Sequence, residues 1–120
     1  MNVCLILWIL FLHWVFDFVL QTDKMALNKS TSTYWLLTHT SSYAFIAFPI
    51  LVPLHISLIH VILFYCYLFT THTAIDGITS RITSYLWKTE KRHWFFVMIG
   101  FDQVLHYATI FVYLANRKMI

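Results

Sequence analysis

The sequence predicts an all-α fold, a polytopic integral membrane bundle of four transmembrane helices that forms one domain over residues 1–120. The chain is 60% hydrophobic and only 11% charged, whereas soluble domains are about 25% charged. Its apolar segments are long and continuous, unlike the alternating strands of a membrane barrel. Two glycines and two prolines in the whole chain leave helices as the natural way to satisfy the backbone in lipid.

Four apolar segments are long enough to be the spans, at about residues 3–21, 34–52, 54–76 and 94–115. The first has no basic region before it and no small-residue cleavage site after it, so we interpret it as a retained helix and not a signal peptide. In the second, Pro49 is expected to kink or end the helix. The third is expected to continue past residue 76, because Ile78, Ile82 and Leu86 recur every four residues.

The polar connections predict the orientation of the bundle. Residues 22–33 and 77–93 are expected to be loops on one side of the membrane, and they carry six basic residues: Lys24, Lys29, Arg81, Lys88, Lys91 and Arg92. The opposite side carries Arg117 and Lys118, so the positive-inside rule places both loops in the cytoplasm. The Ser-Thr run at 30–33 offers N-cap oxygens to the second span. The net charge of +3 marks topology and does not indicate a nucleic-acid partner.

Ionisable residues recur inside these apolar spans in three pairs spaced four residues apart. The pairs are His13 with Asp17, His72 with Asp76, and Asp102 with His106. Residues four apart share one face of a helix. Counted at 1.5 Å per residue, these six and His39 all lie roughly 0–18 Å from the same membrane face. We therefore expect seven titratable side chains to converge in one pocket.

Such residues are costly in a bilayer, by a few kcal/mol each, and are normally paired, ligated or exposed to a cavity. Imidazoles and carboxylates are ligands for divalent transition metals, so we predict a site for zinc, manganese or iron. Its predicted ligands are His13, Asp17, His72, Asp76, Asp102 and His106, and His39 and Asp102 are the predicted catalytic residues. Alternatively, each pair forms its own local hydrogen bond and holds no metal. Gln21 is expected at the interface, Gln103 could support the site, and Tyr43 is expected to be a packing residue.

The ordered motifs also resemble a known family. They are His13-x3-Asp17-x3-Gln21-Thr22-Asp23, Asn28-Lys29, His39, His72-x3-Asp76 and Asp102-Gln103-x2-His106. This set resembles the "domain of unknown function 3307" family, small polytopic membrane proteins of bacteria and phages. The resemblance implies a multi-pass protein of the bacterial inner (plasma) membrane and leaves the function open. A looser similarity in residue types and fold class exists to membrane-bound metal-dependent hydrolases.

The leading functional hypothesis is a metal-dependent hydrolase. Its substrate would be lipid-linked or a small phosphorylated molecule, attracted to the mouth of the pocket by Lys24, Lys29 and Arg81. One alternative is a carrier of protons or metal ions, because His-Asp chains also form proton relays. Another is a phage or prophage membrane effector that acts by binding a partner. Besides the lipid bilayer, a second copy of the chain is an expected partner, since a bundle of short spans is suited to form homo-oligomers.

Overall fold

The computed structural model describes residues 2–120, and every regular element within them is a helix. This confirms the all-α prediction. In chain order the elements are α1 (Val3–Trp14), the π-helix η1 (Val15–Val19), α2 (Asp23–Asn28), α3 (Thr33–Ala44), α4 (Ala47–Leu51), the 3-10 helix η2 (Val52–Leu54), α5 (Leu58–Lys88) and α6 (Arg92–Asn116).

Three helical segments of the described chain are long and apolar enough to cross a membrane: Thr33–Leu54, Leu58–Lys88 and Arg92–Asn116. The prediction of four spans is therefore wrong in number. The first apolar segment forms a shorter helix, Val3–Val19, which at 1.5 Å per residue is about 25 Å long. A hydrocarbon core of about 30 Å needs roughly 20 residues. The helix is short because the chain leaves it at Leu20 to reach α2.

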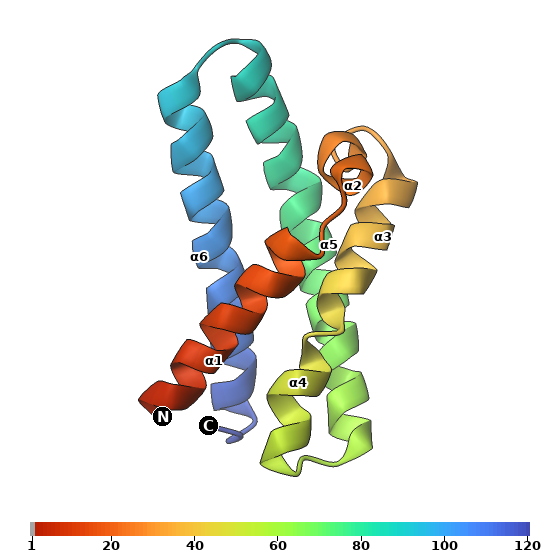
Figure 1. Cartoon of the computed structure of the whole chain (residues 1–120), viewed down its shortest axis with the longest axis vertical. Helices are drawn as coiled ribbons and strands as arrows, with labels where there is room; N and C mark the ends of the chain where they lie inside the picture. Colours follow the sequence, from red (N-terminus) through yellow and green to blue (C-terminus); the bar gives the residue numbers. More distant parts are fainter. Residues whose placement is uncertain (1) are drawn as a thin grey trace.

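The two longest helices, α5 and α6, form an antiparallel hairpin on which the other helices pack (Figure 1). Helices α3 and α4 lie along α5, and α1 runs obliquely from the end that holds both chain termini (Figure 1). At the other end, the tip of the α5–α6 hairpin extends beyond the remaining helices, and α2 packs against α3 beside it.

Two irregular turns in the helices follow from the local sequence. Helix α3 stops at Ala44 and α4 starts at Ala47, because Pro49 has no N–H to donate to the carbonyl of Phe45. At this break the backbone hydrogen bond spans three residues and not four, because Ile46 N donates to Tyr43 O at 3.0 Å. The predicted interruption by Pro49 is confirmed. In η1, Leu20 N donates to Val15 O at 2.9 Å, and this wider turn carries Asp17 at its centre.

The connection predicted as a polar loop at residues 22–33 contains the short helix α2. The Thr22 side chain accepts a hydrogen bond from Met25 N and so caps its first turn. The predicted cap of the next helix is confirmed, because the Ser32 hydroxyl accepts from Trp35 N. The predicted continuation of the third span is also confirmed, since α5 runs unbroken to Lys88.

The core has an apolar part and a polar part. Towards the end that holds the termini, the space between helices is filled by fully buried apolar side chains, including Ile9, Phe64, Leu68, Ile110 and Leu114. The buried polar residues lie on the same helices, one or more turns further from the end with the termini, at His13, His72 and His106. The apolar part thus closes the polar part off from the end with the termini.

Candidate metal centre

The seven ionisable residues that the sequence predicts to converge do lie together. They come from α1, η1, α3, α5 and α6, and ion-pair or hydrogen-bond distances join them into one network. Six are at most 4% exposed: His13, Asp17, His39, His72, Asp76 and His106. The Asp102 side chain is 14% exposed. The other two histidines of the spans, His55 and His60, are exposed and line a separate pocket beside the C-terminal residues.

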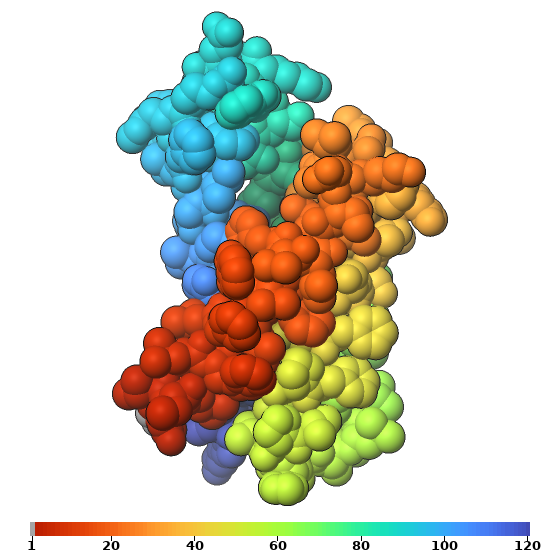
Figure 2. All heavy atoms as spheres, viewed as in Figure 1, coloured from red at the N-terminus to blue at the C-terminus, as the bar shows by residue number. Residues whose placement is uncertain are grey.

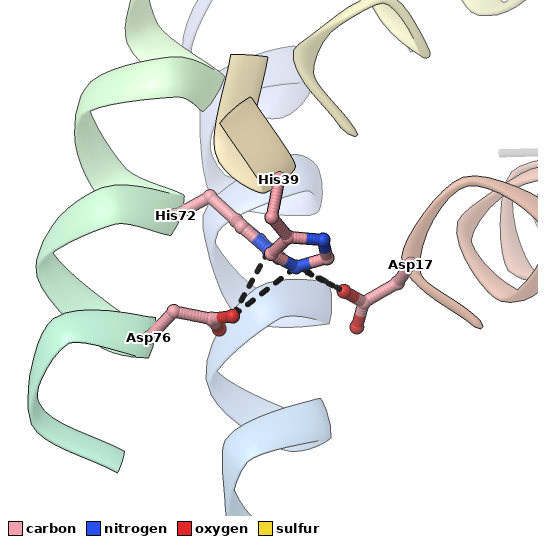
Figure 3. A group of neighbouring side chains, drawn as sticks. All are labelled: Asp17, His39, His72 and Asp76. Carbon is pink, nitrogen blue, oxygen red and sulfur yellow. Dashed lines mark hydrogen bonds and ion pairs between the residues drawn. The ribbon is translucent and has the colours of Figure 1, made fainter. Parts of the chain in front are cut away.

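Four side chains form the closest group, in which each offers one ligand atom and all four atoms lie within 4.8 Å of one another: Asp17, His39, His72 and Asp76 (Figure 3). His39 Nε2 lies 3.2 Å from both Asp17 Oδ1 and Asp76 Oδ2. His72 Nε2 lies 3.3 Å from Asp17 Oδ1, 3.6 Å from Asp76 Oδ2 and 3.1 Å from His39 Nε2. The four atoms therefore point at a common centre.

This donor set fits a tetrahedral metal ion. Ligands bound at about 2.0–2.1 Å to such an ion lie about 3.3 Å from one another, and the separations given above run from 3.1 to 3.6 Å. Hydrogen bonds alone do not satisfy the group. His39 Nε2 carries at most one proton, yet it faces two carboxylate oxygens and the Nε2 of His72. In addition, His39 Nδ1 is buried without a hydrogen-bond partner.

A second, smaller group shares Asp17 with the first and adds Asp102 and His106. His106 Nε2 lies 3.0 Å from Asp76 Oδ1 and 3.3 Å from Asp102 Oδ2. Its other ring nitrogen lies 3.1 Å from His72 Nδ1. His106 therefore connects Asp102 to the four-residue group.

His13 has a different position from the one predicted for it. Its Nδ1 lies 3.0 Å from Tyr43 Oη and its Nε2 lies 2.7 Å from Gln103 Oε1. The nearest atom of Asp17 is 3.6 Å from Nε2. Both ring nitrogens are thus used by neutral partners, and His13 belongs to neither candidate ligand group. His39, which was predicted to be catalytic, is one of the four candidate donors, and His13 is not.

Three neutral residues support the cluster: Gln103, for which the sequence left a supporting role open, Tyr43, which was expected to be a packing residue, and Thr79, which had no expected role. The Tyr43 ring stacks on His72 with 3.8 Å between centroids. Gln103 Nε2 donates to Asp102 Oδ2 at 3.0 Å, and Thr79 Oγ1 donates to Asp102 Oδ1 at 2.6 Å. Their spacing was the available signal, since Tyr43 follows His39 by one turn and Gln103 adjoins Asp102.

Lys29 enters the site from the turn between α2 and α3, with its Nζ 2.8 Å from Asp76 Oδ2. Burial by itself lowers the pKa of Lys29, but the adjacent Asp76 carboxylate outweighs it and the pKa lies above the ordinary lysine value. Lys29 is therefore a charged member of the site, although the sequence analysis placed it only at the mouth.

A cavity of about 440 Å³ extends from Asp17, Asp76 and Asp102 towards the tip of the α5–α6 hairpin. Figure 2 shows this hollow between α2, in orange, and the two arms of the hairpin, in teal and blue. Its basic lining residues are Lys29 and Lys88. Lys24 and Arg81, which were expected at the mouth, are exposed and are not part of the lining.

Comparison with known proteins identifies a family. A family model described as "Protein of unknown function (DUF3307)" matches residues 5–119, nearly the whole chain. The resemblance inferred from the motifs is confirmed. No curated protein and no solved structure matches the chain, so the looser similarity to membrane-bound metal-dependent hydrolases has no support from these comparisons.

Proposed function

Because this chain belongs to the DUF3307 family, whose function is unknown, we propose a function from the site itself. We propose an integral membrane protein that binds one divalent metal ion and hydrolyses an anionic substrate, lipid-linked or phosphorylated. Asp17, His39, His72 and Asp76 would hold the ion, which we expect to be zinc, manganese or iron. The observation that supports this most strongly is the convergence of four ligand atoms at the closed end of a cavity lined by lysines.

The charge of the cluster supports a single divalent ion. Asp17, Asp76 and Asp102 contribute three negative charges, and Lys29 contributes one positive charge. With neutral imidazoles, two negative charges remain in a largely buried site, and one divalent ion neutralises them. Protonation of two histidines would neutralise the cluster equally well, and the metal analysis described below separates these two states.

We assign the remaining residues from their positions. When bound, the ion would supply Lewis-acid chemistry to the substrate by accepting a further ligand beside the four protein donors. Asp102 lines the cavity outside the four-donor group, so it serves as general base and takes a proton from the attacking water at Oδ2. The water oxygen forms a bond to phosphorus, the bond from phosphorus to the leaving oxygen breaks, and the leaving oxygen receives the proton that Asp102 took from the water. Thr79 and Gln103 hold the two Asp102 oxygens in place.

We further propose that the cavity opens on the cytoplasmic side of a bacterial inner membrane. The proposal rests on the positive-inside rule. The segments at this end, residues 22–33 and 77–93, carry six of the eight Lys and Arg residues of the chain. In the structure they lie at the end of the molecule opposite to the termini (Figure 1).

A carrier of protons or metal ions is less well supported by the structure. A carrier needs a polar path to both faces of the membrane. Beyond Tyr43 and His106, the space between the helices is filled by Phe64, Leu68 and Ile110, each with 0% exposure. Among the described residues, the opening that reaches the polar cluster is the cavity lined by Asp17, Asp76 and Asp102.

Elemental analysis of tag-free, detergent-purified protein tests the proposal. We expect about one transition-metal ion per chain in the wild type and less than about a tenth of that in His39→Ala and His72→Ala, since each loses a direct ligand. His60→Ala is the matched control, because it removes an exposed imidazole that hydrogen-bonds to Ser57 and lies outside the cluster. Absence of metal from the wild type, or equal metal in all four proteins, would overturn the proposal.

A further inference from the structure

The cavity above the metal centre has a polar wall on α5. Thr79, Ser80, Thr83 and Ser84 line it, and their spacing places two successive pairs of hydroxyls on one face of the helix. Lys88 continues this face one turn further out. The Thr79 hydroxyl donates to Asp102 and that of Thr83 to a helix carbonyl, whereas Ser80 Oγ is buried without any hydrogen-bond partner. At 8% exposure, Ser80 is a polar group that the protein leaves unsatisfied in the wall of a cavity.

A second unsatisfied group lines the same cavity. Gln21, in the chain between η1 and α2, also lines it, and its Oε1 is buried without a partner. Unpaired buried polar atoms are rare and each costs about 1–3 kcal/mol. Both atoms belong to residues that line one cavity together with Lys29 and Lys88. The three carboxylates of the lining belong to the metal centre, where Lys29 already pairs with Asp76, so Lys88 is the lysine left to bind an anion. The two unsatisfied atoms and Lys88 indicate that a ligand with several polar oxygens and negative charge completes the site.

The rest of the lining is apolar. Phe18 comes from η1, Trp87 from α5, and Phe95 and Ile99 from α6. Phe18 is 44% exposed and Trp87 is 50% exposed, so apolar side chains form the rim as well as the wall. A small water-soluble phosphate makes no apolar contacts with such a rim, whereas a hydrocarbon chain can lie along it.

We propose that this cavity binds a lipid that carries a phosphate group, with its head against the hydroxyl face of α5 and its chain leaving between η1 and α6. Ser80 and Lys88 bind the phosphate oxygens, and Gln21 pairs with the head group through its amide. The inference deepens the proposed function and rests on it, because it takes the cavity to be the substrate entrance and selects the lipid-linked class of substrate.

Binding of dodecyl phosphate to the full chain in dodecyl maltoside micelles tests this inference, with bound molecules counted by mass spectrometry of the intact protein. The detergent has the same twelve-carbon chain and an uncharged head, so it controls for the chain alone. Inorganic phosphate controls for the head alone. We expect one dodecyl phosphate per chain, bound at least about tenfold more tightly than inorganic phosphate.

Two variants locate the site. Ser80→Ala and Lys88→Met should each weaken dodecyl phosphate binding about tenfold, the typical effect of losing one hydrogen bond to a charged group. Ser57→Ala and Lys118→Met remove a hydroxyl and a lysine from the pocket beside the termini and should leave binding unchanged. Equal affinity for inorganic phosphate, or wild-type affinity in both cavity variants, would overturn the inference.

The same titration is run on chelator-treated and metal-loaded protein, so that the two proposals can fail separately. If the protein takes up no metal when loaded but still binds dodecyl phosphate, the inference is supported and the metal centre is ruled out. A protein that binds metal but no dodecyl phosphate removes the inference and leaves the metal centre intact.

Discussion

Lys29 Nζ lies 2.8 Å from Asp76 Oδ2, and this ion pair joins the turn before α3 to the middle of α5. The same Asp76 oxygen is one of the four candidate ligand atoms, 3.2 Å from His39 Nε2. An ammonium group and a bound metal ion would therefore share one carboxylate oxygen, so we expect the charge of the lysine and the occupancy of the site to be coupled.

Lys29→Met should act in opposite directions on metal-free and metal-bound protein. Without metal, the Asp76 side chain, 2% exposed, loses its lysine partner, and removing one partner of a buried ion pair costs about 3–5 kcal/mol. Thermal unfolding in chelator should therefore occur at a lower temperature than in the wild type. With metal, loss of a nearby positive charge should raise affinity by about tenfold or more, measured by competition with a chromophoric chelator. Lys29→Arg keeps the charge, and an increase in its affinity as large as that of Lys29→Met would contradict the coupling.

The hydrogen bond between Tyr43 and His13 should contribute to stability. Tyr43→Phe keeps the ring that stacks on His72 but leaves His13 Nδ1 buried without a partner, at a cost of about 1–3 kcal/mol. Tyr113→Phe is the matched control, because Tyr113 Oη is buried and already has no partner. The free energy of unfolding should fall in the first variant only, and metal content should stay at the wild-type value in both.

Substitution of the proposed ligand Asp17 and of the proposed general base Asp102 should separate metal binding from catalysis. Asp17→Asn removes a ligand atom and should abolish metal binding. Asp102→Asn leaves the four donors in place, so it should retain about one metal ion per chain while phosphate release falls about 10²–10⁴-fold, the usual contribution of a general base. Elemental analysis and a phosphate assay on the same samples measure both effects. Two ions per wild-type chain, with one lost in Asp102→Asn, would instead favour a dimetal site.

Gly77 adjoins Asp76, but nothing in its surroundings requires a glycine. A Cβ atom there would lie 3.7 Å from Leu36 Cδ2, an ordinary contact. Gly77→Ala should therefore stabilise α5 by about 0.5–1 kcal/mol, the gain of alanine over glycine inside a helix. Gly100→Ala is the control in α6, where nothing lies within 4 Å of the added atom. Lower thermal stability or loss of metal in Gly77→Ala alone would show that the packing at this position is tighter than described.

The sequence was enough to predict that the site residues converge, because this depends on how deep each residue lies in the membrane along its helix. Residues such as His72 and His106 lie on long helices, and counting at 1.5 Å per residue places them at one level without knowledge of packing. Which ring nitrogen faces which neighbour depends instead on the rotation of each helix and on side-chain rotamers. For that reason His13, whose spacing from Asp17 matches the other pairs, turned out to bond to Tyr43 and Gln103.

The elements that the sequence analysis missed are those whose length or curvature tertiary contacts decide. The π-turn at Val15–Val19 and the short helix Asp23–Asn28 shorten the first apolar helix and carry Lys29 to Asp76. Periodicity cannot detect a single wider turn, and Thr22 with Asp23 was the only local signal for a helix in that connection. The number of spans was therefore the part of the fold that the sequence predicted least well.

Helix α5 has 31 residues, so it is about 46 Å long, and the long axis of the molecule measures 47 Å. A hydrocarbon core is only about 30 Å thick. The excess is taken up by tilt or by projection of the hairpin tip, which holds the hydroxyl wall and Lys88. We therefore expect longer-chain lipids to draw the cavity into the hydrocarbon and shorter-chain lipids to lift it among the head groups. Bilayer thickness would then regulate access to the site without any change in its residues.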